Sequence, residues 1–474
     1  MKNDYLRRIS LAFIMTFVCA TVSYAYDFEV DSIYYNITSE SDYEVEVTYS
    51  RKYKGNIVIP ESVTYNEITY SVTSIGDEAF QGRNITSIEL PNSLVSIGVL
   101  VFEGCDGLTS IDFPDGLTSI GIQAFFGCSK LTSVTFNDGL KSIGDMAFYA
   151  CERLTSIDLP DGLTYLGGGA FSDCYNLTSV NLPDSLTCID DVVFYSCQSL
   201  TSMDVPDGVT SIGDMAFYHC SSLTSIDLPE SLTSIGEEAF YSCGLTSIDL
   251  PDGLTIIGDR AFYWCSHLTS IDLPDGLTSI GDGTFYGCYG LTSIDLPDGL
   301  TSIGEEAFYK CGTNLPTLTS IDLPDGLTSI GYRAFYGCTK LTDIYSQNET
   351  PPTCYDSDVF SSSTYSDATL HVPSEALSDY KTASTWKEFY TIVGDVVTGV
   401  EDIAITQDYS IRASDGVITV SGVSGTVYVY NINGKKVAEA TADGGTTGIR
   451  ISHHGVYIVK IYDGKSSATQ KVII

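Results

Sequence analysis

The sequence is poor in histidine and lacks the motifs that carry catalysis. No phosphate-binding loop, no Gly-x-Ser-x-Gly motif and no Cys-x-x-Cys pair is present, so neither nucleotide chemistry nor a zinc site is indicated. The histidines are scattered, and none belongs to a nucleophile or metal-binding motif. We therefore expect neither an enzyme nor a cofactor. The five histidines are His219, His267, His371, His453 and His454.

Basic residues are also scarce, with 23 Lys and Arg against 61 Asp and Glu and a net charge of -38. Nucleic acid and anionic membrane surfaces would repel such a chain, so we expect no nucleic-acid partner. Beyond the N-terminus no apolar run approaches the roughly 20 residues of a membrane-spanning helix. The composition favours a protein that is soluble outside the cell.

The N-terminus carries an export pattern. Basic residues precede an apolar run at 9–20, and small residues follow it at Ser23 and Ala25. This pattern predicts a signal peptide over residues 1–25. Cys19 leaves a lipoprotein site open as an alternative, although the valine before it is a poor residue for that signal.

What the chain has in abundance is one motif, LTSIDLPDGLTSIGxxAFYxC, which returns almost unchanged with a period of 23 residues from Leu108 to Lys340. Cysteine marks the same place in eleven copies, with one deletion near Gly244 and one insertion at 312–317. Such a repeat predicts a solenoid whose function lies on an extended surface. The marking residues are Cys105, Cys128, Cys151, Cys174, Cys197, Cys220, Cys243, Cys265, Cys288, Cys311 and Cys338.

Each unit reads as two extended pieces and two turns. Ile271 and Leu273 have the spacing of a strand, and the Pro-Asp-Gly segment at 274–276 turns the chain. A second extended piece ends at Ile280, and the acidic residue that follows, Asp282, suits the start of one helical or 3-10 turn.

Neighbouring coils must complete one another's interior. About six buried apolar side chains give ~9–18 kcal/mol per coil, whereas ordering the backbone costs ~1–2 kcal/mol per residue. We expect like residues about 4.8 Å apart, in a parallel sheet along one face with a buried row of phenylalanines. This row contains Phe125, Phe148, Phe171, Phe194, Phe217, Phe240 and Phe262.

The unit resembles the BspA-like, or Treponema-type, leucine-rich repeat of bacterial surface proteins over about Ile57 to Val393. The resemblance implies a β-dominated leucine-rich-repeat solenoid with short helical or 3-10 turns. It also implies a secreted or cell-surface location, at the exterior of the outer membrane, and a host or bacterial surface protein or glycan as partner. We expect an N-terminal cap and first coil at 26–84, eleven repeats at 85–340 and a capping coil at 341–394.

The last stretch, 395–474, reads as alternating strands and glycine turns that predict a small β-sandwich. Val427 to Gly434 reads as a hairpin with a tight Asn-Gly turn. This ending is similar to the C-terminal sorting domain of the type IX secretion system, which implies the secretion machinery as a partner. A plain β-sandwich accessory domain is the alternative.

The cysteine row has two interpretations. An exported protein meets an oxidising environment, which favours disulfides. Parallel stacking, however, holds Cβ atoms ~4.8 Å apart where a disulfide needs ~3.8 Å, and the mature chain keeps an odd number of cysteines. We therefore favour a row of small buried apolar thiols.

Aspartates and tyrosines form the candidate binding rows. The aspartates either accept hydrogen bonds from serines two residues earlier or attract calcium or a cationic partner, because stacked carboxylates suit a hard cation. The tyrosines either stack and seal the coil edge or form an exposed strip for protein or sugar. The candidates are Asp204, Asp227, Asp249, Asp272 and Asp295, with Tyr218, Tyr241, Tyr263, Tyr286 and Tyr309.

The sequence therefore leaves two alternative functions. The solenoid is an adhesin or binding protein that uses an extended acidic surface of Ser, Asp and Tyr, or a structural spacer without a specific ligand. Local irregularities at 312–317, Trp264, His267 and Tyr332 are the places where a binding site could form.

Overall fold

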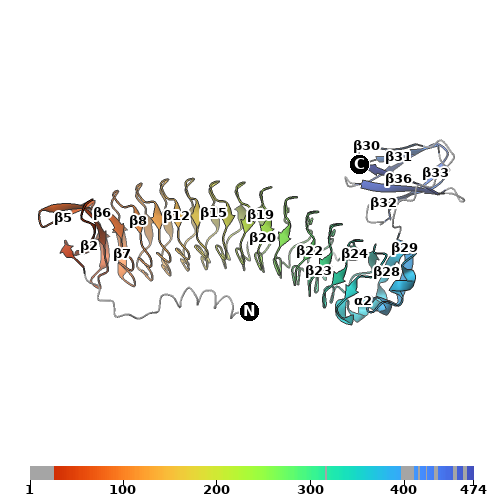
Figure 1. The fold of residues 1–474 in the computed structure, drawn as a ribbon, viewed down its shortest axis with the longest axis horizontal. Coiled ribbons are helices and arrows are strands. Elements are labelled where there is room, and N and C mark those ends of the chain that lie inside the picture. The colour runs from red at the N-terminus through yellow and green to blue at the C-terminus, as the bar shows by residue number, and fades with distance from the viewer. Residues whose placement is uncertain are drawn as a thin grey trace.

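The computed structural model describes residues 26–314, 318–396, 410–414, 417–422, 424–431, 436–451, 456–462 and 467–473. The predicted signal peptide, part of the insertion, the predicted Asn-Gly turn and the two histidines His453 and His454 lie outside these ranges. Figure 1 shows the repeats as coils stacked in a gently curved row.

Each regular coil has two short strands, which pair in parallel with the same residues of one or both neighbouring coils. Ser133 pairs with Ser110 in the first ladder, and Ser142 pairs with Ser119 in the second. In the middle coils the first strand shrinks to isolated bridges such as Asp249 with Asp272. The parallel stacking predicted from the repeat is confirmed, with two ladders where one was expected.

The first ladder contains β7 (Asn84–Glu89), β9 (Ser110–Asp112), β11 (Ser133–Thr135), β13 (Ser156–Asp158), β15 (Ser179–Asn181), β17 (Ser202–Asp204), β19 (Ser225–Asp227), β24 (Ser320–Leu323) and β26 (Asp343–Ser346). The second contains β8 (Ser96–Ile97), β10 (Ser119–Ile120), β12 (Ser142–Ile143), β14 (Tyr165–Leu166), β16 (Cys188–Ile189), β18 (Ser211–Ile212), β20 (Ser234–Ile235), β21 (Ile256–Ile257), β22 (Ser279–Ile280), β23 (Ser302–Ile303), β25 (Ser329–Ile330) and β27 (Thr353–Cys354).

The segment between the second strand and the cysteine differs from the helical turn predicted there. It consists of tight turns, and its residue Gln123 has a φ of 55°, which stops a right-handed helix. The amides of Gln123 and Phe125 donate to Asp145 and Ala147 of the next coil, at 2.8 and 2.7 Å. A helix would use these amides internally, so bonding between coils excludes it.

The phenylalanine row is the centre of the solenoid, as predicted. Its rings are fully buried and nearly parallel, with centroids 4.8 to 6.1 Å apart from one coil to the next. Tyr53 covers the first ring, Phe80, at 4.6 Å. Phe389 meets the last ring, Phe360, edge to face at 5.3 Å. Aromatic side chains therefore cap both ends of the row.

Irregular elements close the two ends. At the N-terminal end, β4 extends the first ladder by pairing with β7, and β6 joins the second through β8. At the other end the indole of Trp386 donates to Pro352 O at 2.8 Å. The elements are β1 (Phe28–Val30), β2 (Ile33–Ser39), β3 (Glu44–Val47), β4 (Lys54–Val58), β5 (Ser62–Tyr65) and β6 (Ile68–Ile75), then η1 (Ser357–Val359), α2 (Ser362–Asp367), β28 (Thr369–Pro373), α3 (Leu377–Tyr380), η2 (Trp386–Glu388) and β29 (Thr391–Val396).

The C-terminal region has a separate apolar core between two antiparallel sheets, in agreement with the predicted β-sandwich. One sheet has the order β30-β31-β34 and the other β33-β32-β35-β36. The strands are β30 (Ser410–Ser414), β31 (Val417–Ser421), β32 (Ser424–Asn431), β33 (Lys436–Asp443), β34 (Thr446–Arg450), β35 (Val456–Tyr462) and β36 (Ser467–Ile473).

Candidate functional site

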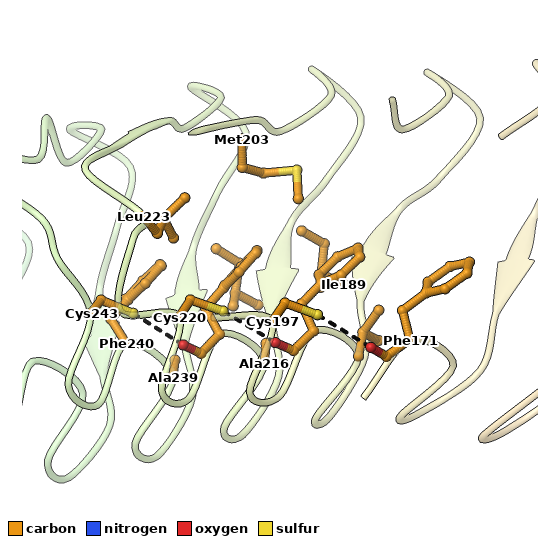
Figure 2. Close-up of a cluster of buried hydrophobic side chains, with 14 of the residues drawn as sticks. Phe171, Ile189, Cys197, Met203, Ala216, Cys220, Leu223, Ala239, Phe240 and Cys243 are labelled. Carbon is orange, nitrogen blue, oxygen red and sulfur yellow. Dashed lines mark hydrogen bonds between the residues drawn. The ribbon is translucent and has the colours of Figure 1, made fainter. Parts of the chain in front are cut away.

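The cysteine row lies inside the solenoid and holds successive coils together. The Sγ of Cys197, Cys220 and Cys243 each donates to a phenylalanine carbonyl of the preceding coil, at 3.2, 3.1 and 3.0 Å (Figure 2). All thirteen cysteines of the described ranges are free. Burial raises the pKa of the Cys220 thiol far above its usual range. These neutral, shielded thiols have a structural role and are poor nucleophiles.

The aspartate row lies on the first ladder, and its side chains are exposed. Asp204 pairs in register with Asp227, and Asp272 bridges both Asp249 and Asp295. The predicted hydrogen bonds from the serines two residues earlier do not form for these five residues. Among the described side chains no group of three or more His, Cys, Asp or Glu is arranged to hold a metal ion. The described aspartates of this row therefore include no such group for the calcium alternative.

Hydrogen bonds form instead where another residue interrupts the aspartate row. Thr135 Oγ1 donates to Asp112 at 2.6 Å, and Asn181 Nδ2 donates to Asp158 at 2.8 Å. A hydrogen-bond donor in the next coil thus replaces a second carboxylate, and the repulsion between two stacked carboxylates is avoided. The repeat period alone could have suggested these pairs, because each donor follows its acceptor by one unit.

A further acidic row, just after the second ladder, binds backbone amides of the next coil. Oδ1 of Asp259 accepts the amide of Asp282 at 2.9 Å, and Oδ1 of Asp282 accepts the amide of Glu305 at 2.7 Å. These acids were expected at the start of a helical turn. Their carboxylates instead satisfy amides that the tight turn leaves free.

The tyrosine row is half-buried and stacked face to face, so the sealing interpretation is correct for its rings. From Tyr218 to Tyr309 the ring centroids lie 4.3 to 4.8 Å apart. Neighbouring rings cover both faces of the interior members, which leaves ring edges and hydroxyl groups accessible. Burial raises the pKa of the Tyr286 hydroxyl, which therefore remains protonated and able to donate at neutral pH. A ligand meets edges here and cannot stack on these rings.

Two positions in each coil flank the tyrosine row and were missed in the sequence. Both are left-handed: Met215 and Glu238 have φ values of 54° and 55°, and His219 and Ser242 have values of 58° and 57°. A side chain in this conformation costs roughly 1–2 kcal/mol relative to glycine. The signal was available, since glycine occupies the same places in other copies, at Gly127, Gly169, Gly283 and Gly287.

Trp264 is the most prominent of these left-handed residues. Its side chain is 47% exposed, and it has a φ of 60°. The indole lies over Gly287 of the next coil, where a Cβ would come within 3.1 Å of its Cδ1. Its ring contacts Tyr289 edge to face at 6.3 Å. Of the other predicted irregularities, His267 is exposed and Tyr332 lies beneath the guanidinium of Arg333 at 4.7 Å.

Short parallel ladders, one buried leucine-rich interior and a strict residue period together define a leucine-rich-repeat solenoid. The family model described as BspA type leucine rich repeat region matches residues 73–201, 187–315 and 313–384. The chain belongs to this family. A second model, described as secretion system C-terminal sorting domain, matches residues 410–474. The ending is therefore a type IX sorting domain, as the resemblance implied.

One solved structure supports this assignment. A leucine-rich repeat protein from Bacteroides ovatus is 34% identical, with a TM-score of 0.61, and the match covers 76% of this chain and 98% of that one. A leucine rich cell surface protein from Faecalibacterium prausnitzii is 30% identical with a TM-score of 0.49, over 69% of this chain and 96% of that one. The comparison with curated proteins gave no match.

The two family matches show where the protein is located. A BspA-type repeat region followed by a type IX sorting domain identifies a secreted or cell-surface protein, and the sorting domain implies the secretion machinery as a partner. Neither match is to a family of enzymes. Within the described ranges, no helix combines the length and apolar character needed to cross a membrane.

Proposed function

We propose that the protein is an adhesin, a surface protein that binds a host or bacterial surface protein or glycan along the tyrosine side of the solenoid. It performs no catalysis in this proposal, because the repeat offers no place where unlike reactive groups converge. The tyrosine row supplies ring edges and hydroxyl donors, with Tyr218, Tyr241, Tyr263, Tyr286 and Tyr309 as contact residues. The aspartate row contributes a diffuse attraction for basic partners.

One observation carries this proposal against the spacer alternative. The left-handed positions beside the tyrosine row hold Met215, Arg260, His219, Trp264 and Lys310, although glycine is cheaper in that conformation. A spacer needs only the fold, and glycine would serve the fold at these positions. These varied side chains lie on one side of the molecule and each costs conformational free energy. This pattern favours a role in binding a partner.

A glycine variant separates the two functions. Replacing Met215, His219, Trp264 and Lys310 by glycine removes varied side chains and relieves the left-handed strain, and Arg260 is kept because it neutralises Glu238, so the coils should keep their fold. We expect the variant to lose adhesion to cells and to immobilised extracellular-matrix proteins and glycans. Circular dichroism and the thermal midpoint verify the fold.

The matched control makes the same change in coils nearer the N-terminus, at Leu100, Gln123 and Met146, which have φ values of 53° to 57°. The control should retain most of the adhesion. Full adhesion by the first variant would favour the spacer.

A further inference from the structure

Two coils of the solenoid share a pattern of charge. Gly-Glu-Glu-Ala-Phe-Tyr occurs at Glu237 and Glu238 and again at Glu305 and Glu306, and each copy is followed one coil later by Arg-Ala-Phe-Tyr. The arginines are Arg260 and Arg333. The structure therefore offers an internal comparison between two acidic pairs in nearly the same surroundings.

In the first copy the arginine neutralises the pair. Nη1 of Arg260 lies 3.7 Å from Glu237 Oε1 and 3.6 Å from Glu238 Oε1. The Glu238 side chain is only 10% exposed, so a guanidinium balances a carboxylate that is largely removed from water.

In the second copy the arginine points elsewhere. Nη2 of Arg333 lies 3.7 Å from Asp358, and the guanidinium lies over the rings of Tyr332 and Tyr336 at 4.7 and 5.2 Å. Tyr332 occupies the place that Asp259 has in the first copy, and its ring provides a cation–π platform. Within the described ranges neither glutamate of the second pair forms an ion pair.

A hollow of about 220 Å³ lies beside this second pair. Gly283 lines it, at the place where neighbouring coils carry Arg260 and Glu306. A Cβ built on Gly283 would lie 3.2 Å from Arg260 Cγ and 3.3 Å from Tyr263 Cδ2, so the coils approach closely at this glycine and the hollow lies beside it. The hollow is lined by Tyr241, Arg260, Tyr263, Asp282, Glu305 and Glu306.

We propose that this hollow receives an arginine side chain from a partner protein. The incoming guanidinium would pair with Glu305 and Glu306 from the Gly283 side, and its methylene stem would lie beside the edge of the Tyr263 ring. The strongly acidic chain attracts basic segments over a longer range. The inference rests on the proposed function, because it places one contact of the adhesin on the tyrosine side.

The experiment uses the full exported chain and a blocked tripeptide, acetyl-Gly-Arg-Gly-amide, with the uncharged citrulline tripeptide as comparison. Fluorescence of Trp264, which follows Tyr263 directly, reports binding, since the other tryptophan, Trp386, is fully buried. We expect saturable binding of the arginine peptide and at least tenfold weaker binding of the citrulline peptide. Equal binding of the two peptides would overturn the proposal.

Variants locate the site. The double substitution E305Q/E306Q should weaken binding at least tenfold, while D249N/D272N removes two charges from the exposed aspartate row, whose residues do not line the hollow, and should leave it unchanged. Equal losses in both variants would show attraction to the acidic surface in general and refute the hollow as the site.

Filling the hollow provides a second test. G283R should abolish binding, because it places an arginine in a row that already carries Arg260 and Arg333 at φ values of 56° and 52°, and its Cβ requires only a small shift of the Arg260 side chain and the Tyr263 ring. G127R adds the same charge at an open left-handed position and should bind as the parent does. Binding retained by G283R would overturn the assignment. If the arginine peptide does not bind while the glycine variant still loses adhesion, this inference fails and the proposed function stands.

Discussion

Gly236 is one of the positions at which an added methyl group should push two coils apart. A Cβ there would lie 2.6 Å from the amide nitrogen of Asp214 and from the carbonyl carbon of Gly213, both backbone atoms of the preceding coil. Ordinary contact begins at 3.4 Å, so the coils must separate by about 0.8 Å. The bonds from the amides of Gly236 and Glu237 to that coil, both 2.9 Å, would then exceed hydrogen-bonding distance.

The expected cost follows from these terms. Overpacking costs about 1–3 kcal/mol, and each lost hydrogen bond about 1 kcal/mol, so Gly236→Ala should lose ~3–5 kcal/mol of stability. Gly127→Ala is the matched change. It has a φ of 68° but open space around a Cβ, and Ala150 already occupies the same place in the next coil at 55°. That variant should lose only about 1 kcal/mol.

Urea denaturation followed by circular dichroism measures both variants, and amide exchange shows where the damage lies. Exchange should accelerate in the coils on either side of Gly236, because each coil contacts only its neighbours. If both variants lost the same unfolding free energy, the reasoning would be wrong, because it predicts that backbone contact at Gly236 costs more than a positive φ at Gly127.

Three other outcomes are expected. Alkylation of the native protein should modify Cys188, which is exposed, and spare Cys220, whose pKa burial raises; mass spectrometry before and after unfolding checks this, and rapid labelling of both would refute it. Burial raises the pKa of Glu238 in the folded protein. As the pH rises from the unfolded pKa through this raised folded pKa, the stabilisation that the protonated Glu238 gives to the folded state is lost. E238Q should therefore be more stable than the parent at neutral pH, and the two should be equally stable below the ordinary glutamate range. Calcium and magnesium at equal ionic strength should change the thermal midpoint equally, because the described aspartates of the row include no group arranged to hold a metal ion; a calcium-specific rise reversed by a chelator would restore the calcium alternative.

The period predicted which residues of successive coils coincide. It therefore predicted the buried phenylalanines and the interior position of the cysteines, and it aligned the tyrosines in a row without deciding between stacked rings and an exposed strip. It did not predict the bonds within a coil, because the acidic residues before Ala and Phe suit a helical turn when only local preferences are considered. The tight turn forms instead because the amides of Gln123 and Phe125 bond the next coil. Hydrogen bonds within one coil compete with hydrogen bonds to the next coil, and the sequence of a single unit does not show which of the two forms.

A specific site on a solenoid must arise where one copy departs from the others, because identical coils present identical surfaces. The coil at 268–290 has glycine at both left-handed positions, Gly283 and Gly287, and side chains of the preceding coil border the space above both. The indole of Trp264 covers Gly287, whereas the space at Gly283 remains a hollow. This coil thus differs from the others by the glycine at 283, which lies next to Glu305 and Glu306. The arginine one coil later, Arg333, pairs with Asp358 and does not neutralise these two glutamates. Binding at such a place requires no change in the repeated core, which explains how a nearly invariant unit can still carry a local function.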